Sequence, residues 1–162
     1  MVRRSILRWE EKIIKINPSQ TILIVEDSPE DYETTIRAFK KAGISNNIVH
    51  CEDGDNALDY LFRRGTYAGH EKSPRPGLIL LDLNLPGADG REVLAEIKNS
   101  NDTKKIPVIV LTTSLDERDI EQCYADGANS YIHKPVDLPG FFNAIKRLKD
   151  YWFEIVILPK SE

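Results

Sequence analysis

The sequence predicts an α/β fold, a doubly wound (βα)5 sandwich of three layers around a five-stranded parallel sheet. Short apolar runs alternate five times with segments whose apolar residues recur at helical spacing. The runs are apolar at nearly every position, which indicates strands that are buried on both faces. Buried strands that alternate with helices form parallel sheets covered by helices, with right-handed crossovers.

The first strand and helix have clear boundaries. Residues 21–25 form an apolar, β-branched run that stops at Glu26 and Asp27. Ser28 and Pro29 then begin a helix, because a serine hydroxyl caps the first turn and proline has the dihedral angle that this turn needs. The side chains expected to face inward are Ile36, Phe39 and Ala42, before Gly43 ends the helix.

Four further units repeat this order. Strands are predicted at residues 47–51, 78–83, 107–112 and 129–132, with a turn at Asp53 and Gly54 and a polar loop over residues 65–77. The helices after them are expected to bury Ala57, Leu58, Leu61 and Phe62; Val93, Leu94 and Ile97; Ile120, Cys123 and Tyr124; and Leu138, Phe142, Ile145 and Leu148.

The length of 162 residues indicates one domain, which we place at residues 20–151. Residues 1–19 are expected to be an N-terminal extension, either helical or disordered. Residues 152–162 are predicted to be an apolar C-terminal tail that the domain or another chain covers, because exposed apolar patches are unfavourable.

The composition excludes several classes of protein. The formal net charge is −4 and the basic residues are scattered, so nucleic acid is not an expected partner. Neither the two cysteines nor His50, His70 and His133 have metal-ligand spacing. No apolar stretch reaches the ~20 residues that cross a bilayer, and no signal-peptide core is present. We therefore expect a cytoplasmic protein without a membrane partner.

Carboxylates follow two of the predicted strands. Glu26 and Asp27 come after the first strand, and Asp82 lies at the end of the third. Because the carboxyl ends of parallel strands meet at one edge, where α/β sheets bind ligands, these side chains are expected to lie together. Close carboxylates repel one another unless a divalent cation lies among them, so the sequence predicts a site for Mg²⁺ or Mn²⁺.

Two further groups are predicted at the same edge. Thr112 ends the fourth strand and offers a hydroxyl donor, and Lys134 follows the fifth strand as a cation for phosphate oxygens. A carboxylate nucleophile, Mg²⁺ and an ammonium group suffice for phosphoryl transfer. The expected product is an aspartyl phosphate at Asp82.

Five motifs, in this order along the chain, resemble the receiver domain of two-component response regulators. They are Val25-Glu26-Asp27, the run from Leu80 to Pro86 around Asp82, Asp89-Gly90, Leu111-Thr112-Thr113 and Lys134-Pro135. The resemblance spans about residues 20 to 150 and implies a flavodoxin-like fold.

A narrower resemblance is to the stand-alone receivers that partner cyanobacterial and bacterial phytochromes. It lies in the loop from Arg63 to Pro76, the block from Asp89 to Leu94, the run from Leu111 to Ser114 and the ending from Tyr151 to Pro159. It implies a homodimer formed by the last strand, the last helix and the C-terminal tail.

The resemblance to receiver domains also implies a role for each site residue. Asp82 is the phosphoacceptor and Lys134 binds the phosphoryl group. The metal ligands are Glu26, Asp27, Asp82 and the backbone carbonyl of Asn84, and the switch residues are Thr112 and Tyr131. The Lys134–Pro135 peptide bond is expected to be cis, and Thr113 is expected to narrow access to the acyl phosphate, because smaller residues are common there in the family.

The leading hypothesis is a single-domain response regulator that accepts a phosphoryl group on Asp82 from a sensor histidine kinase, with a phytochrome as a candidate. The protein would catalyse only its own phosphorylation and dephosphorylation, so it would not be an enzyme in the usual sense. It would pass on the signal through contact with other proteins. A flavodoxin-like electron carrier is an alternative function, since it would have the same layered fold. The acidic segment after the first strand, however, would repel a flavin phosphate. An aspartyl-phosphate phosphatase would need an acid at the position of Asn84.

Overall fold

The computed structural model describes residues 20–69, 73–157 and 159, and it contains the predicted five-stranded parallel sheet in the order β2-β1-β3-β4-β5. The strands are β1 (Thr21–Val25), β2 (Ile48–Cys51), β3 (Pro76–Leu81), β4 (Val108–Thr112) and β5 (Ser130–His133). The helices are α2 (Pro29–Lys41), α3 (Gly54–Phe62), α4 (Gly90–Asn99), α5 (Glu117–Ala125) and α6 (Leu138–Lys149), with a 3-10 turn η1 (Gly65–Tyr67) and a π-helical turn η2 (Asp150–Ile155).

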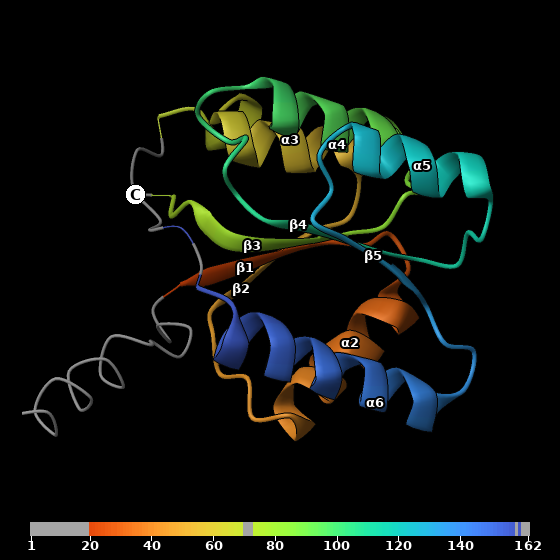
Figure 1. Cartoon of the computed structure of the whole chain (residues 1–162). Helices are drawn as coiled ribbons and strands as arrows, with labels where there is room; N and C mark the ends of the chain where they lie inside the picture. Colours follow the sequence, from red (N-terminus) through yellow and green to blue (C-terminus); the bar gives the residue numbers. More distant parts are fainter. Residues whose placement is uncertain (1–19, 70–72, 158, 160–162) are drawn as a thin grey trace, which may run out of the picture.

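Helices cover both faces of the sheet. Figure 1 shows α3, α4 and α5 on one face and α2 and α6 on the other. Alternate side chains of each strand therefore enter two separate apolar clusters, such as Leu23 on the first face and Ile24 on the second. Since β1, β3 and β4 are buried along their whole length, the apolar runs and the (βα)5 prediction are confirmed.

The third strand lies two residues earlier than predicted. It begins at Pro76, which aligns with Thr21 of β1 through an irregular register, and it ends at Leu81. Asp82 is thus the first residue beyond the strand. The backbone still aligns there, because the Asp82 N–H donates to the carbonyl oxygen of Val25 at 3.1 Å.

The buried face of α6 differs from the prediction. Phe141, Ile145 and Leu148 are buried, whereas Leu138 is half exposed and Phe142 lies at the edge of the core. Phe141 and Phe142 are neighbours on a helix, so their directions differ by about 100° and either fits an apolar stripe. The buried face of α5 is also narrower than predicted. Cys123 is the only buried residue of this helix, and Tyr124 is half exposed.

The segment after α6 continues into the core instead of leaving the domain at once. Trp152 and Phe153 are buried in the cluster beneath α2 and α6, with Val156 packed against it. Tyr151 and Ile157 remain exposed. The predicted extension over residues 1–19 lies outside the described residues.

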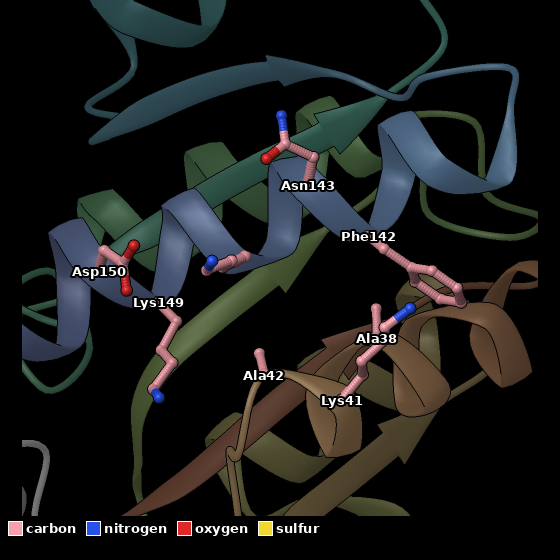
Figure 2. A pocket seen from close by; sticks show the side chains of 8 residues that line it. Ala38, Lys41, Ala42, Phe142, Asn143, Lys149 and Asp150 are labelled. Carbon is pink, nitrogen blue, oxygen red and sulfur yellow. The ribbon is translucent and has the colours of Figure 1, made fainter.

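A groove separates the C-terminal halves of α2 and α6 (Figure 2). Its lining includes Lys41, Lys146 and Lys149, and the ammonium group of Lys41 lies 4.9 Å from the centre of the Phe142 ring. Basic residues in the last turn of a helix interact favourably with the helix dipole, which accounts for these lysines. Within the described part of the chain, we find no helix with the length and apolar character that a membrane crossing requires.

Candidate functional site

Backbone hydrogen bonds fix the site residues at the carboxyl edge of the sheet. The N–H of Glu26 donates to Cys51 at 3.1 Å, and the N–H of Lys134 donates to Thr112 at 2.7 Å. Asp82 is held on β1 in the same way. Each of these residues therefore continues the strand ladder by one position, so its side chain projects from a rigid backbone.

The three predicted carboxylates come together. Oxygens of Glu26, Asp27 and Asp82 all lie within 4.8 Å of one another. Glu26 and Asp82 are buried, and Asp27 is exposed. A cluster of carboxylate oxygens with one side open to solvent is the donor set that Mg²⁺ and Mn²⁺ prefer, so these residues fit the expected cation.

Lys134 lies inside the carboxylate cluster and is only 5% exposed. Its Nζ atom donates to Glu26 Oε2 at 2.5 Å, to Asp82 Oδ2 at 3.0 Å and to Asp31 Oδ2 at 3.1 Å. Asp31 belongs to the first turn of α2 and was not predicted as a site residue. No periodic pattern points to Asp31, because Asp27 precedes the helix and the partner Lys134 lies 103 positions away along the chain.

Burial and ion pairing act on the titration of this cluster in opposite directions. Burial raises the pKa of Glu26 to about 7, and the hydrogen bond and charge of Lys134 only partly oppose this effect. Burial alone would lower the pKa of Lys134, but the hydrogen bond that Lys134 donates to Glu26 and the charge of Asp82 raise it above its ordinary value. Lys134 therefore keeps its positive charge among three carboxylates, those of Glu26, Asp31 and Asp82.

Two neighbours orient the carboxylates. The N–H of Asn84 donates to Asp82 Oδ1 at 3.3 Å, and the N–H of Ser28 donates to Glu26 Oε1 at 3.1 Å. The ring nitrogen Nε2 of His50 lies 2.8 Å from the carbonyl oxygen of Glu26, and the His50 ring stacks on Tyr32. His50 thus packs behind the site. The carbonyl of Asn84 as a metal ligand stays a prediction.

The predicted switch residues lie on β4 and β5, two strands that lead to the carboxyl edge of the sheet. Thr112 is fully buried, and its hydroxyl oxygen accepts from the N–H of Ser114 at 3.4 Å. Tyr131 is half-buried, and its hydroxyl donates to the carbonyl oxygen of Ser114 at 2.9 Å. The two side chains therefore share one partner in the loop after β4.

The expectation of a cis Lys134–Pro135 bond is wrong, since the peptide bonds of the described residues, this one included, are trans. Lys134 nevertheless points inward, because the three ion pairs hold its ammonium group. A groove of about 270 Å³ opens beside it, lined in part by Asp31 and by the exposed Thr113.

The arrangement has the parts that phosphoryl transfer needs. Asp82 supplies a carboxylate oxygen with a fixed direction, and Lys134 supplies a cation within 3.0 Å of it. The acidic cluster can hold a divalent cation, and the groove opens next to Lys134. Charge neutralisation and positioning supply most of the catalysis in such reactions.

Comparisons with known proteins agree with this chemistry. The family model for the response regulator receiver domain matches residues 22–146. Response regulator Rcp1 of Synechocystis sp. is 45% identical over 145 residues, which cover 90% of this chain and 97% of Rcp1.

Two solved structures are similar along nearly their whole length. The Mn²⁺-bound form of Rcp1 has a TM-score of 0.81 at 44% identity and covers 87% of this chain and 99% of its own. The phosphorylated cyanobacterial phytochrome response regulator RcpA has a TM-score of 0.81 at 41% identity and covers 88% and 99%. With this agreement of sequence, fold and site, the chain belongs to the family of response regulator receiver domains.

Proposed function

We propose that the protein is a phosphorylation-dependent response regulator that accepts a phosphoryl group on Asp82 from the phosphohistidine of a sensor histidine kinase. The observation that carries this proposal is the buried cluster in which Lys134 bridges Glu26 and Asp82, with Asp27 next to them. This cluster combines a nucleophile, a cation for phosphate oxygens and a set of metal ligands.

The reaction follows from this geometry. A carboxylate oxygen of Asp82 attacks phosphorus, the new O–P bond forms, and the N–P bond of the phosphohistidine breaks with its electron pair left on the imidazole nitrogen. Lys134 faces Asp82 at 3.0 Å and neutralises charge on the phosphoryl oxygens. Glu26, Asp27, Asp82 and the Asn84 carbonyl would hold Mg²⁺ or Mn²⁺, which supplies further charge neutralisation when it is bound.

The phosphoryl group then biases a two-state equilibrium. Thr112 is assigned as the hydroxyl that turns toward the phosphoryl group, and Tyr131 as the aromatic side chain that responds. Their shared contact with Ser114 supports this assignment, because movement of either side chain disturbs the same loop. Catalysis is limited to phosphorylation and dephosphorylation of Asp82 itself.

The proposed phosphoryl donor is a cytoplasmic histidine kinase of the phytochrome type. Similarity to Rcp1 and to the phytochrome response regulator RcpA supports this choice. Phosphotransfer from a purified phytochrome kinase at least tenfold faster than from an unrelated histidine kinase is the expected result, and equal rates would contradict the phytochrome partnership.

We also propose a homodimer through β5, α6 and the segment after α6. A groove of about 480 Å³ lies on this side, lined by aromatic and apolar residues that include Tyr131, Leu148 and Trp152. Tyr124 and Tyr151 line it as well, and each is about half exposed. Exposed aromatic side chains around a groove are typical of protein interfaces, which also supports output by protein contact.

The site lacks groups that each of the two rival functions would require. An electron carrier would need a phosphate-binding loop after β1, where Asp31 and Glu26 instead present carboxylates. A phosphatase with an aspartyl-phosphate intermediate would need an acid two residues after Asp82, where Asn84 donates its backbone N–H to the nucleophile.

The test uses the whole chain, acetyl phosphate and Mg²⁺, with intact-mass spectrometry. We expect one added phosphoryl group, which Asp82→Asn abolishes and EDTA prevents. Asp126→Asn is the matched control, because this carboxylate accepts from Gln122 at the end of α5, outside the cluster. An unmodified protein that forms no adduct would refute the proposal.

A further inference from the structure

A charged pair links the start of α4 to the start of α5. Arg91 Nε donates to Asp119 Oδ1 at 2.7 Å, and Arg91 Nη2 donates to Asp119 Oδ2 at 2.6 Å. The third guanidinium nitrogen lies 3.0 Å from Asp89 Oδ2. The Asp119 side chain is only 18% exposed, so this two-point contact is short, directional and partly shielded from water.

The residue before Arg91 contacts the backbone next to the proposed phosphoacceptor Asp82. Gly90, the residue before Arg91, donates its N–H to Leu83 at 2.9 Å. A Cβ atom on Gly90 would lie 2.2 Å from the carbonyl oxygen of Asp82, so α4 begins in direct contact with that peptide. A shift of Asp82 therefore moves the start of α4, and Arg91 with it.

The other end reaches both switch residues. Asp119 Oδ2 accepts from the hydroxyl of Ser114 at 2.7 Å, and the same hydroxyl oxygen accepts from the N–H of Asp116 at 3.3 Å, so the contact with Asp119 is the shorter of the two that hold this side chain. Ser114 in turn donates its N–H to Thr112 and accepts from the Tyr131 hydroxyl. The contacts form one continuous path from the backbone of Asp82 to Thr112 and Tyr131.

We propose that Arg91 and Asp119 are a positioning pair that couples the Asp82 loop to Thr112 and Tyr131 by holding Ser114 in place. The inference rests on the proposed function for its role in signalling. It adds a second route between Asp82 and the switch residues, separate from the direct contact of Thr112 with a phosphoryl group. Arg118 and Asp116 provide an internal comparison, because their contact in the same turn is looser, at 3.4 Å, and the Arg118 side chain is 91% exposed.

The first experiment needs no phosphoryl donor. Tyrosines are labelled with fluorotyrosine, and the fluorine NMR signal of Tyr131 is assigned with Tyr131→Phe. We expect Arg91→Gln and Asp119→Asn to shift or split this signal, because each weakens or removes the shorter of the two contacts that hold the Ser114 side chain. Arg118→Gln should leave it unchanged, and Arg91→Lys should recover part of the original signal. If both Arg91→Gln and Asp119→Asn remain folded by circular dichroism and keep the original signal, the inference is wrong.

The second experiment measures coupling during phosphorylation by acetyl phosphate. Rates are compared for the unmodified protein, Arg91→Gln, Tyr131→Phe and the double variant. We expect Arg91→Gln to slow the reaction roughly two- to thirtyfold, and the double variant to be no slower than the slower single variant. If the fold reductions in rate of the two single variants multiply in the double variant, the two residues act independently and the inference is wrong. Failure of the unmodified protein to react would refute the proposed function instead, while the NMR experiment would still decide the inference.

Discussion

At Lys134, one ammonium group contacts three carboxylates from separate parts of the chain. Glu26 follows β1, Asp31 lies in α2 and Asp82 follows β3. Removal of one member of a buried ion pair is costly, because it leaves the other charge in a poorly solvating environment. The stability of the domain without metal should therefore depend strongly on Lys134.

The replacement Lys134→Met keeps the length of the side chain and removes its charge. We expect it to lower the free energy of unfolding by about 3 kcal/mol in EDTA, the size of effect seen when a buried pair is broken. Mg²⁺ should recover part of the loss, because it returns positive charge to the carboxylates. Urea unfolding at pH 7 with EDTA and with Mg²⁺ measures both effects.

Arg37→Met is the control for this prediction. Arg37 pairs with Glu33 on α2, but both side chains are about two thirds exposed. Arg37→Met should lower the free energy of unfolding by no more than about 0.5 kcal/mol, and Mg²⁺ should not change this value. Equal losses in the two variants would contradict a special role of the buried cluster.

At the scale of helices and strands, the first turn of α5 is attached to the fold through charged and polar contacts. Only Cys123 of this helix is buried, whereas Asp119 contacts both Arg91 and Ser114. These two partners lower the pKa of Asp119 to about 2, with Arg91 as the larger cause. The attachment of α5 should therefore depend on pH in the acidic range.

The sign of this dependence follows from the lowered pKa. Asp119 binds a proton less readily in the folded protein than in the unfolded chain, so its contribution to stability is complete above about pH 4 and is lost as the pH falls toward 2. Solvent screens this partly exposed pair, so the full size of the contribution is about 1 kcal/mol. We expect the difference in unfolding free energy between the unmodified protein and Asp119→Asn to shrink over this range. Urea unfolding from pH 2 to 7 measures it, and a constant difference would contradict the prediction.

At the scale of the whole molecule, the surfaces differ in character. The carboxyl edge of the sheet carries the acidic cluster, and the groove between the ends of α2 and α6 carries lysines (Figure 2). The aromatic groove beside β5 and α6 is the one on which we place the homodimer. Burying exposed aromatic side chains would favour association.

Tyr151→Asp tests this surface, because it places a charge on the rim of the aromatic groove, where Tyr151 is 52% exposed. We expect the unmodified protein to sediment as a dimer at micromolar concentration, and Tyr151→Asp to weaken association at least tenfold. Leu115→Asp is the control, since Leu115 is 63% exposed in the loop after β4 and does not line the groove. A monomer in every case, with or without acetyl phosphate, would exclude the proposed dimer.

The sequence by itself determined the order of elements and which carboxylates meet at the edge of the sheet. Runs such as residues 22–25 and 108–111 are apolar at every position, which favours a parallel sheet that buries them on both faces. Because parallel strands end at one edge, the positions of Glu26, Asp27, Asp82 and Lys134 along the chain were enough to predict their proximity.

Only the tertiary structure decided the contacts that depend on how helices rotate and loops turn. The inward direction of Phe141 instead of Phe142 is set by the sheet beneath α6, since both fit a helical stripe. The contacts of Asp31 with Lys134 and of Arg91 with Asp119 join residues that are 103 and 28 positions apart. Charged side chains of this kind carry no periodic signal. Their partners depend on how the helices pack, and the sequence pattern gives only the order of the helices.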